Sequence, residues 1–311
     1  MDEIDISLSM MLMVNSRIPY KDLAEMFNMS VNSIHKRINS LVELDIIQAF
    51  KARLGFANFQ GITNIIIYGI SDIKQKKQLI DKLGENEYIY NVMEGSGNIF
   101  YIHAYLRNIG ELDELVLFVR KMANFRDIIV GIDKQMPPIS LENLSLKPLS
   151  ELDYLIINSL KNNSRKLISD VALEVKASTK TIRRRLDRLT ENSLVQFLID
   201  WYPDKAGIIP AMINLKFASH VIIDDKEFEK KLRNKYGTRI LFIWSFSNLP
   251  SLKFIAILTQ SMKELQEIQV FLLSERYEKV DITVLIEGKL FPTWIDTFLD
   301  DKVNQLKKET K

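Results

Sequence analysis

The sequence predicts an α+β protein of two tandem units, each a winged helix-turn-helix followed by a βαββαβ domain of ferredoxin-like order. Three observations carry this prediction: a repeat separated by 148 residues, three helical patterns at the start of each copy, and alternating strand and helix patterns in the rest. A chain of 311 residues exceeds the usual size of one hydrophobic core, so two or more domains are expected.

The repeat appears without gaps when the sequence is shifted by 148 residues. Across the first 48 positions of the repeat, 14 pairs are identical, including Asn15-Ser16-Arg17 and its counterpart Asn163-Ser164-Arg165. Chance does not plausibly give such an ungapped match, so we interpret the chain as a duplication. Because the period has the size of a domain, a tandem of domains is expected and not a solenoid.

Each copy opens with three helical patterns, and a serine is placed to cap the third. In the second copy apolar residues recur at helical spacing over 150–160, a short helix is expected at Leu167–Val175, and Ser178 caps the next one. The helices expected in the first copy are Ile4–Met13, Tyr20–Phe27 and Val31–Leu44. The β-prone segments that follow, IIQAFKARL and LVQFLIDWY, are suited to wing hairpins.

The rest of each copy alternates in βαββαβ order, which indicates an antiparallel sheet with two helices on one face. In the first copy the expected elements are strand Ile62–Ile70, helix Ile73–Leu83, strands Tyr88–Glu94 and Asn98–Leu106, helix Glu111–Met122 and strand Phe125–Asp133. In the second copy they are strand Ile209–Phe217, helix Asp225–Tyr236, strands Arg239–Phe246 and Leu252–Leu258, helix Met262–Ser274 and strand Lys279–Glu287. The expected domains are 1–54 and 150–203 for the helix-turn-helix parts, 60–135 and 207–290 for the ferredoxin-like parts, a linker at 136–149, and a C-terminal helical tail at 291–311.

Composition favours a soluble protein of the cytoplasm. The chain is 47% hydrophobic and 26% charged, and its apolar runs fall well short of the roughly 20 residues that span a bilayer. It has no cysteine, which excludes disulfides and thiolate chemistry, and its acidic start, MDEIDISLS, is unlike a signal peptide. Residues 149–311 carry a net charge of +4 against −2 for residues 1–148, so the second copy is the one expected to meet a polyanion.

The third helix of each copy presents polar and basic side chains opposite an apolar stripe. In the stretch STKTIRRRLDRL of the second copy, Arg184 and Arg188 are expected to point away from the stripe. Arg185 lies beside the stripe, where pairing with an acidic residue or a phosphate is expected. Arginine can make two hydrogen bonds with guanine and asparagine two with adenine, so both helices suit the DNA major groove. The residues expected to contact DNA are Ser30, Asn32, Ser33, His35, Lys36, Arg37, Asn39, Ser178, Lys180, Thr181, Arg183, Arg184, Arg185 and Arg188.

These motifs resemble the Lrp/AsnC, or feast/famine, family of transcriptional regulators. The resemblance is carried by EIDISLSMML and NSRIPYKDLAEMFNMSVNSIHKRINSLVELDIIQAF in the first copy, and by ELDYLIINSLKNNSRKLISDVALEVKASTKTIRRRLDRLTENSLVQFLI in the second. It implies a winged helix-turn-helix that binds double-stranded DNA, dimerisation through the βαββαβ domains, and control of transcription, often with an amino acid as effector. Usual members have one unit per chain, so this chain is expected to pair its own copies as a pseudo-dimer or to form a homodimer.

In the resembled family, effector binding is associated with the turn between the second and third strands of the βαββαβ domain. That turn reads EGSGNI in the first copy, which makes Gly95, Ser96, Gly97 and Asn98 candidates for contact with an amino-acid-like effector. An ordinary hairpin turn is the competing interpretation. The second copy has the bulkier SFSNLPS with Pro250, so amino-acid sensing is doubtful there.

Two other functions are compatible with this architecture. Siroheme decarboxylases resemble it, but binding a tetrapyrrole calls for pocket histidines or other cations, and the chain has only His35, His103 and His220. The sequence shows no metal-ligand cluster or nucleophile motif, so neither enzyme activity, metal nor cofactor is expected. The other alternative is a protein-interaction module that has lost DNA binding. The first copy could be such a remnant, because only Lys36 and Arg37 are basic in its third helix.

Overall fold

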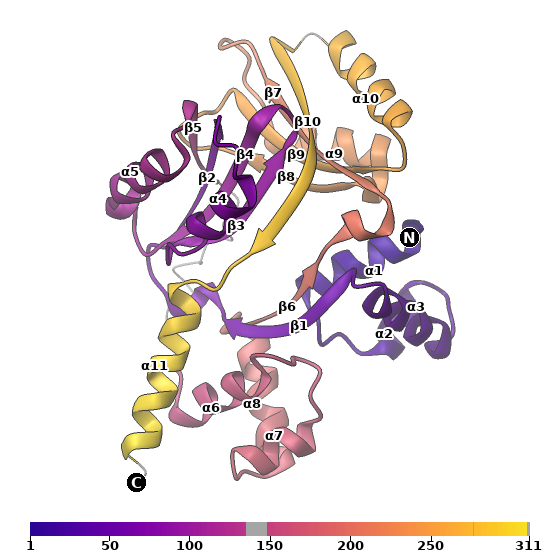
Figure 1. Cartoon of the computed structure of the whole chain (residues 1–311). Coiled ribbons are helices and arrows are strands. Elements are labelled where there is room, and N and C mark those ends of the chain that lie inside the picture. The colour runs from indigo at the N-terminus through magenta and orange to yellow at the C-terminus, as the bar shows by residue number, and fades with distance from the viewer. Residues whose placement is uncertain (135–147, 276, 310–311) are drawn as a thin grey trace. The chain divides into compact units, whose positions relative to one another are not determined.

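The computed structural model describes residues 1–134, 148–275 and 277–309, which form two compact units (Figure 1). The head unit consists of residues 2–60, 148–202 and 292–309, and the sheet unit consists of residues 61–134 and 203–291. Each unit therefore combines corresponding parts of both copies. Most of the expected linker at 136–149 lies outside the described residues.

The head unit contains two helix-turn-helix folds, here called head one and head two. Head one has α1 (Glu3–Val14), α2 (Tyr20–Met26) and α3 (Val31–Glu43), and head two has α6 (Glu151–Leu160), α7 (Ile168–Glu174) and α8 (Thr179–Glu191). The predicted serine caps are present: the hydroxyl of Ser30 accepts a hydrogen bond from the backbone of Ser33, and that of Ser178 from the backbone of Thr181, both at 3.1 Å. Each cap satisfies one of the free N–H groups that begin a helix, which explains where α3 and α8 start.

The strands that follow the third helices join the two heads. Strands β1 (Ile47–Leu54) and β6 (Val195–Trp201) form an antiparallel two-stranded sheet, α1 packs on β6, and α6 packs on β1. The expected wing hairpin within each copy is therefore wrong. Each β-prone segment pairs with its duplicate instead, and this pairing satisfies backbone groups of both strands at once.

The repeated Asn-Ser-Arg tripeptides meet where the heads join. The hydroxyls of Ser16 and Ser164 lie 2.6 Å apart and are fully buried. Arg17 donates to the backbone carbonyls of Ser164 and Lys166, and Arg165 donates to the carbonyl of Ile18 at 3.1 Å. Burial lowers the pKa of both Arg17 and Arg165, but arginine starts so high that both remain charged. The identity of the tripeptides thus has a structural cause, since each one binds the opposite head.

The C-terminal helix α11 (Trp294–Glu309) also belongs to the head unit, where it packs against α6 and β1. Its buried side is apolar, with Trp294 5.0 Å from the ring of Phe59, and Lys161 of α6 holds Asp300 at 2.7 Å. The tail therefore forms an amphipathic helix over Trp294–Glu309. It contacts the first helix of head two and the strand of head one, which makes the two heads unequal.

The sheet unit confirms the βαββαβ order in both copies. The first copy supplies β2 (Thr63–Ile70), α4 (Lys76–Leu83), β3 (Ile89–Gly95), β4 (Ile99–Leu106), α5 (Leu112–Ala123) and β5 (Arg126–Ile132). The second copy supplies β7 (Ile209–Lys216), α9 (Asp225–Tyr236), β8 (Ile240–Ser245), β9 (Leu252–Thr259), α10 (Met262–Ser274) and β10 (Lys279–Leu290).

The eight strands form one antiparallel sheet in the order β5-β2-β4-β3-β10-β7-β9-β8. Strand β10 is longer than predicted because its C-terminal part, Leu285–Leu290, pairs with β3 of the other copy. The outer strands β5 and β8 also meet, through a bridge between Asp133 and Phe246. The copies therefore pair within one chain in this unit as well.

Candidate nucleic-acid interface

The exposed sides of α3 and α8 carry different chemistry at corresponding positions. At four corresponding exposed positions, α8 carries three cations and one carboxylate, whereas α3 carries two amides, an imidazole and one cation. These positions hold Lys180, Arg183, Arg184 and Asp187 in α8, and Asn32, His35, Lys36 and Asn39 in α3. All eight were expected to lie on the outer face or its flank, and the structure places them there.

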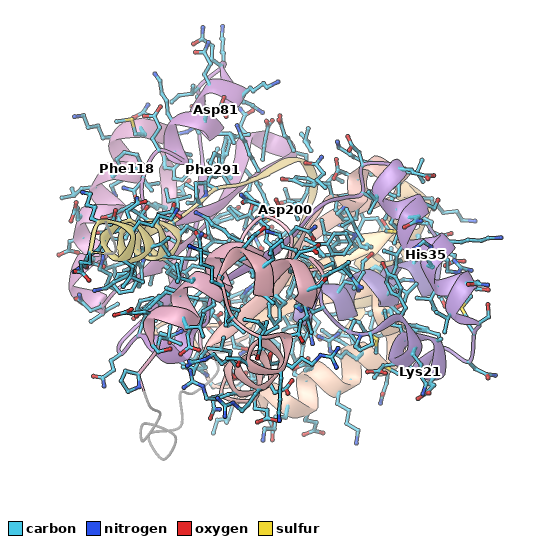
Figure 2. The ribbon with its side chains drawn as sticks, turned by 90° about the horizontal axis from the view of Figure 1, so that it is seen from below. Lys21, His35, Asp81, Phe118, Asp200 and Phe291 are labelled. Atoms are coloured by element: carbon cyan, nitrogen blue, oxygen red, sulfur yellow. The ribbon has the colours of Figure 1, made fainter. Side chains whose placement is uncertain are left out.

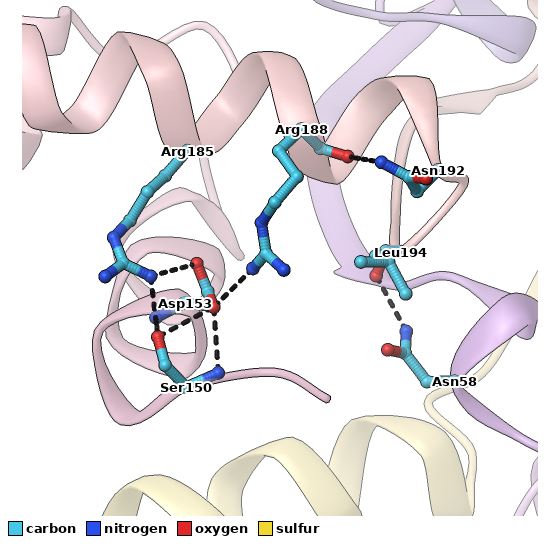
Figure 3. Close-up of polar contacts among 7 residues, drawn as sticks. All are labelled: Asn58, Ser150, Asp153, Arg185, Arg188, Asn192 and Leu194. Carbon is cyan, nitrogen blue, oxygen red and sulfur yellow. Dashed lines mark hydrogen bonds and ion pairs between the residues drawn. The ribbon is translucent and has the colours of Figure 1, made fainter. Parts of the chain in front are cut away.

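In head two, a buried carboxylate binds two arginines on the side of α8 that faces α6 (Figure 3). Asp153 of α6 is fully buried and accepts from Arg185 at 3.0 Å and from Arg188 at 2.5 Å. Arg185 also donates to the hydroxyl of Ser150 at 2.7 Å. Burial acts to raise the pKa of Asp153, but hydrogen bonds from Ser150 and the two arginines outweigh it and hold the pKa below its usual value. Asp153 is therefore a carboxylate at neutral pH.

This cluster corrects the expected orientation of Arg188. Its side chain does not point away from the apolar stripe but turns toward α6, where the buried charge of Asp153 attracts it. The prediction that Arg185 pairs with an acidic residue is confirmed. Of the three arginines expected to face outward or flank that face, Arg183 and Arg184 are exposed and form no ion pair with any described residue.

Head one has the matching cluster with a different balance of charge. Arg37 of α3 binds two carboxylates, Asp5 at 2.7 Å and Asp2 at 2.9 Å, and Ser40 stands where head two has Arg188. The cluster of head one therefore has a net charge of −1, from one arginine and two carboxylates. That of head two has +1, from two arginines and one carboxylate.

The roles of Asp2, Asp5 and Asp153 in these clusters were missed by sequence reasoning. The signal was present, because Asp5/Asp153 and Arg37/Arg185 are both identical pairs of the repeat. A carboxylate in the first helix and an arginine in the third, kept together in both copies, point to an ion pair between those helices.

A pocket of about 360 Å³ lies beside this cluster in head two. It is lined by Pro148, Ser150, Asp153, Arg184, Arg185 and Arg188. Three guanidinium groups facing one carboxylate leave a net charge of +2, which suits a phosphate oxygen or another oxyanion.

The expected effector turn lies in the sheet unit and supports its pairing of strands. A side chain on Gly95 would meet Thr283 of β10 at 2.2 Å, and the hydroxyl of Ser96 accepts from the backbone of Val284 at 3.2 Å. Gly97 and Asn98 have positive φ, 74° and 63°, which makes the turn tight. The matching turn of the second copy docks in the same way, since the side chain of Asn248 makes two 2.8 Å hydrogen bonds with the backbone of β5.

The three histidines differ in their surroundings. His35 is exposed on α3 of the head unit (Figure 2), and its ring centroid lies 5.3 Å from that of Tyr20. His220 is exposed in the sheet unit. His103 is buried in the sheet unit, where burial lowers its pKa to about 3, so it is neutral at physiological pH. No cluster of three potential metal ligands occurs among the residues that the structure describes.

The helices formed by the same described residues lack the length and apolar character needed to cross a bilayer.

Comparison with known proteins agrees with this geometry. Residues 1–48 and 149–196 each match the winged helix-turn-helix DNA-binding family. The model of this family therefore matches the chain twice. The two matches coincide with head one and head two of the structure.

Relatives of this chain include two uncharacterized HTH-type transcriptional regulators. One, from Pyrococcus abyssi, is 34% identical over 83 residues, which are 27% of this chain and 56% of that protein. The other, from Pyrococcus horikoshii, is 27% identical over 143 residues, 42% of this chain and 90% of that protein. The chain thus spans just over half of the first relative and most of the second. The expected kinship with HTH-type regulators is confirmed.

Solved structures match over one copy or over both. Escherichia coli AsnC is 23% identical and covers 44% of this chain and 94% of its own, with a TM-score of 0.32. A siroheme decarboxylase is 12% identical, but it covers 98% of this chain and 100% of its own, with a TM-score of 0.59. At this identity the second match shows a shared fold along the full length and nothing about activity. The predicted fold class, a duplicated unit of helix-turn-helix and ferredoxin-like domain, is confirmed.

Proposed function

We propose that this protein is a cytoplasmic transcriptional regulator of Lrp/AsnC type that binds double-stranded DNA with the third helices of its two heads. The observation that supports this most directly is the exposed side of α8. Lys180, Arg183 and Arg184 are exposed there, next to the Ser178 cap at the start of the helix. A helix N-terminus favours phosphate, and exposed arginines at this position can reach base edges in the major groove.

The buried cluster gives head two a way to position α8 for this task. Asp153 holds Arg185 and Arg188 on the side of α8 that faces α6. These two arginines orient the helix, which leaves Arg184 as the candidate for bidentate contact with guanine. In head one, Asn32 and Asn39 supply groups that can pair with adenine, and Lys36 supplies a phosphate contact.

A small ligand acting on the sheet unit is part of the proposal. The Gly95–Asn98 turn joins β3 to the neighbouring copy, so a ligand bound there could alter how the copies pair. An amino-acid-like effector would need backbone N–H groups and a cation for its carboxylate. Lys76, which binds Glu94 at 2.8 Å, places one cation beside the residue that precedes this turn.

Paired substitutions test DNA binding. Arg184→Ala should weaken binding to a selected duplex about 5- to 150-fold, the effect of about 1–3 kcal/mol for a lost bidentate base contact. Lys36→Ala, at the corresponding position of head one, should weaken binding less and reduce the salt dependence. Arg120→Ala removes an exposed arginine of α5 in the sheet unit and serves as the control, with binding unchanged. Fluorescence anisotropy at fixed salt measures all three; unchanged affinity for both head variants would contradict the proposal.

The full-length match to a siroheme decarboxylase supports one alternative function, binding or processing of a tetrapyrrole. Adding siroheme to the purified protein and recording the Soret band tests it. A shifted band that His103→Gln abolishes would favour this alternative. An unshifted band, together with DNA binding sensitive to Arg184→Ala, would leave the regulator as the function.

A further inference from the structure

The two heads are joined in one compact unit, so every chain presents one α3 together with one α8. Strand β1 pairs with β6, and the buried hydroxyls of Ser16 and Ser164 meet at 2.6 Å. Arg17 and Arg165 each donate to backbone carbonyls of the opposite head. The chain therefore presents its two third helices together, as a symmetric dimer does, but without identical subunits.

Within the third helices, the buried residues are alike in the two heads, whereas several exposed residues differ. The buried stripes are alike, with Ile34, Ile38 and Leu41 in α3 and Ile182, Leu186 and Leu189 in α8. At four pairs that are exposed in both heads the side chains differ: Asn32/Lys180, His35/Arg183, Lys36/Arg184 and Asn39/Asp187. Two of these pairs also exchange a base-pairing amide for a charged group.

We infer that the DNA target of this protein consists of two unlike half-sites, and that each chain binds it in a single orientation. This inference rests on the proposed function. A symmetric dimer binds a palindromic site because its two reading helices are identical. Here one head offers amides suited to adenine and the other offers arginines suited to guanine, so the preferred half-sites differ.

Orientation follows from the same difference. Turning the chain around would place the guanidinium groups of α8 on the half-site that suits α3, and the amides of α3 on the other. One mismatched bidentate contact changes affinity roughly 5- to 150-fold. In the opposite orientation both third helices meet the half-site that does not suit them, so this orientation is poorly populated.

The absence of cysteine provides a direct test. Glu43 and Glu191 are exposed, end α3 and α8 respectively, and occupy corresponding positions of the repeat. Glu43→Cys and Glu191→Cys, each made in the full chain, accept a DNA-cleaving iron chelate at one known position. A duplex first selected from a random pool with the unmodified protein is then cut by each conjugate.

The expected result is that the selected duplex is not palindromic, that the Glu43→Cys conjugate cuts near one end, and that the Glu191→Cys conjugate cuts near the other. Equal cutting at both ends by either conjugate would show two orientations and overturn the inference, while DNA binding itself would stand. Cutting by the head two conjugate alone would also overturn it, because head one would then read no half-site. Failure to select any duplex would reject the proposed function and the inference together.

A variant with exchanged faces gives an independent readout. This variant exchanges the four differing exposed side chains of α3 with those of α8. The substitutions in α3 are Asn32→Lys, His35→Arg, Lys36→Arg and Asn39→Asp. Those in α8 are Lys180→Asn, Arg183→His, Arg184→Lys and Asp187→Asn. All eight positions are exposed, so the buried stripes stay intact. The variant should bind the same duplex with its two cutting positions interchanged. Cutting positions that stay in place would show that something other than these side chains sets the orientation.

Discussion

Head one and head two share a frame and differ in how charge is arranged on it. In head one a single arginine, Arg37, bridges Asp2 and Asp5, and in head two a single carboxylate, Asp153, holds Arg185 and Arg188. Both arrangements tie the third helix to the first. A substitution in a homodimer changes both heads at once, but in this chain the heads can change separately. The duplication has kept the ion pair that builds the fold and varied the charge around it.

Removing the shared carboxylate should have the largest effect and should differ between the heads. Asp153→Ala leaves two arginines without their buried partner, and we expect a loss of stability of about 3 kcal/mol. Asp5→Ala should cost only about 1 kcal/mol, because Asp2 stays 2.9 Å from Arg37. Urea unfolding, with hydrogen exchange in α1, α3, α6 and α8, measures both losses locally. Equal losses would mean that the number of carboxylates is irrelevant.

The copies also differ within the sheet unit, and pH reveals this difference. His103 lies three residues before the end of β4, and Ala256 lies at the same place in β9. The pKa of His103 is lowered to about 3 from the usual 6.5, so above pH 6.5 neither the folded nor the unfolded state carries its proton. As pH falls below 6.5, only the unfolded state binds that proton, and stability falls by at most about 1.4 kcal/mol per pH unit.

His103→Gln should therefore flatten the pH dependence of the sheet unit between pH 6.5 and 4.5. Urea midpoints of the natural protein and the variant, measured at several pH values, give the two slopes. An unchanged slope would show that His103 takes up a proton in the folded protein and that its burial is not decisive.

Exchanging the residues of one corresponding pair should have the smallest effect. Ser40→Arg adds a cation beside Asp2 and Asp5 and makes the cluster of head one neutral, so we expect DNA affinity to rise about twofold to fivefold at low salt. Arg188→Ser makes the reverse change in head two and should lower affinity by a similar factor. Binding isotherms at two salt concentrations measure both. If DNA affinity did not change, or changed in the opposite direction, the net charge of these clusters would have no influence on DNA binding.

The sequence alone determined the duplication, the three helices of each head, their serine caps and the βαββαβ order. These are local properties: periodic apolar residues, a capping hydroxyl and identities at a fixed separation, each legible along the chain. The exposed sets on α3 and α8 followed from the same helical geometry.

Only the tertiary structure decided how the copies meet and where Arg188 points. The pairing of β1 with β6, and of β10 with β3, depends on which strand edge lies within reach, and no local pattern encodes that choice. Helical angle alone placed Arg188 on the side of α8 away from its apolar stripe, but it does not tell whether a neighbouring helix lies within reach of so long a side chain. Its direction was set by the charge of Asp153, 35 positions earlier in the chain and beside it in space.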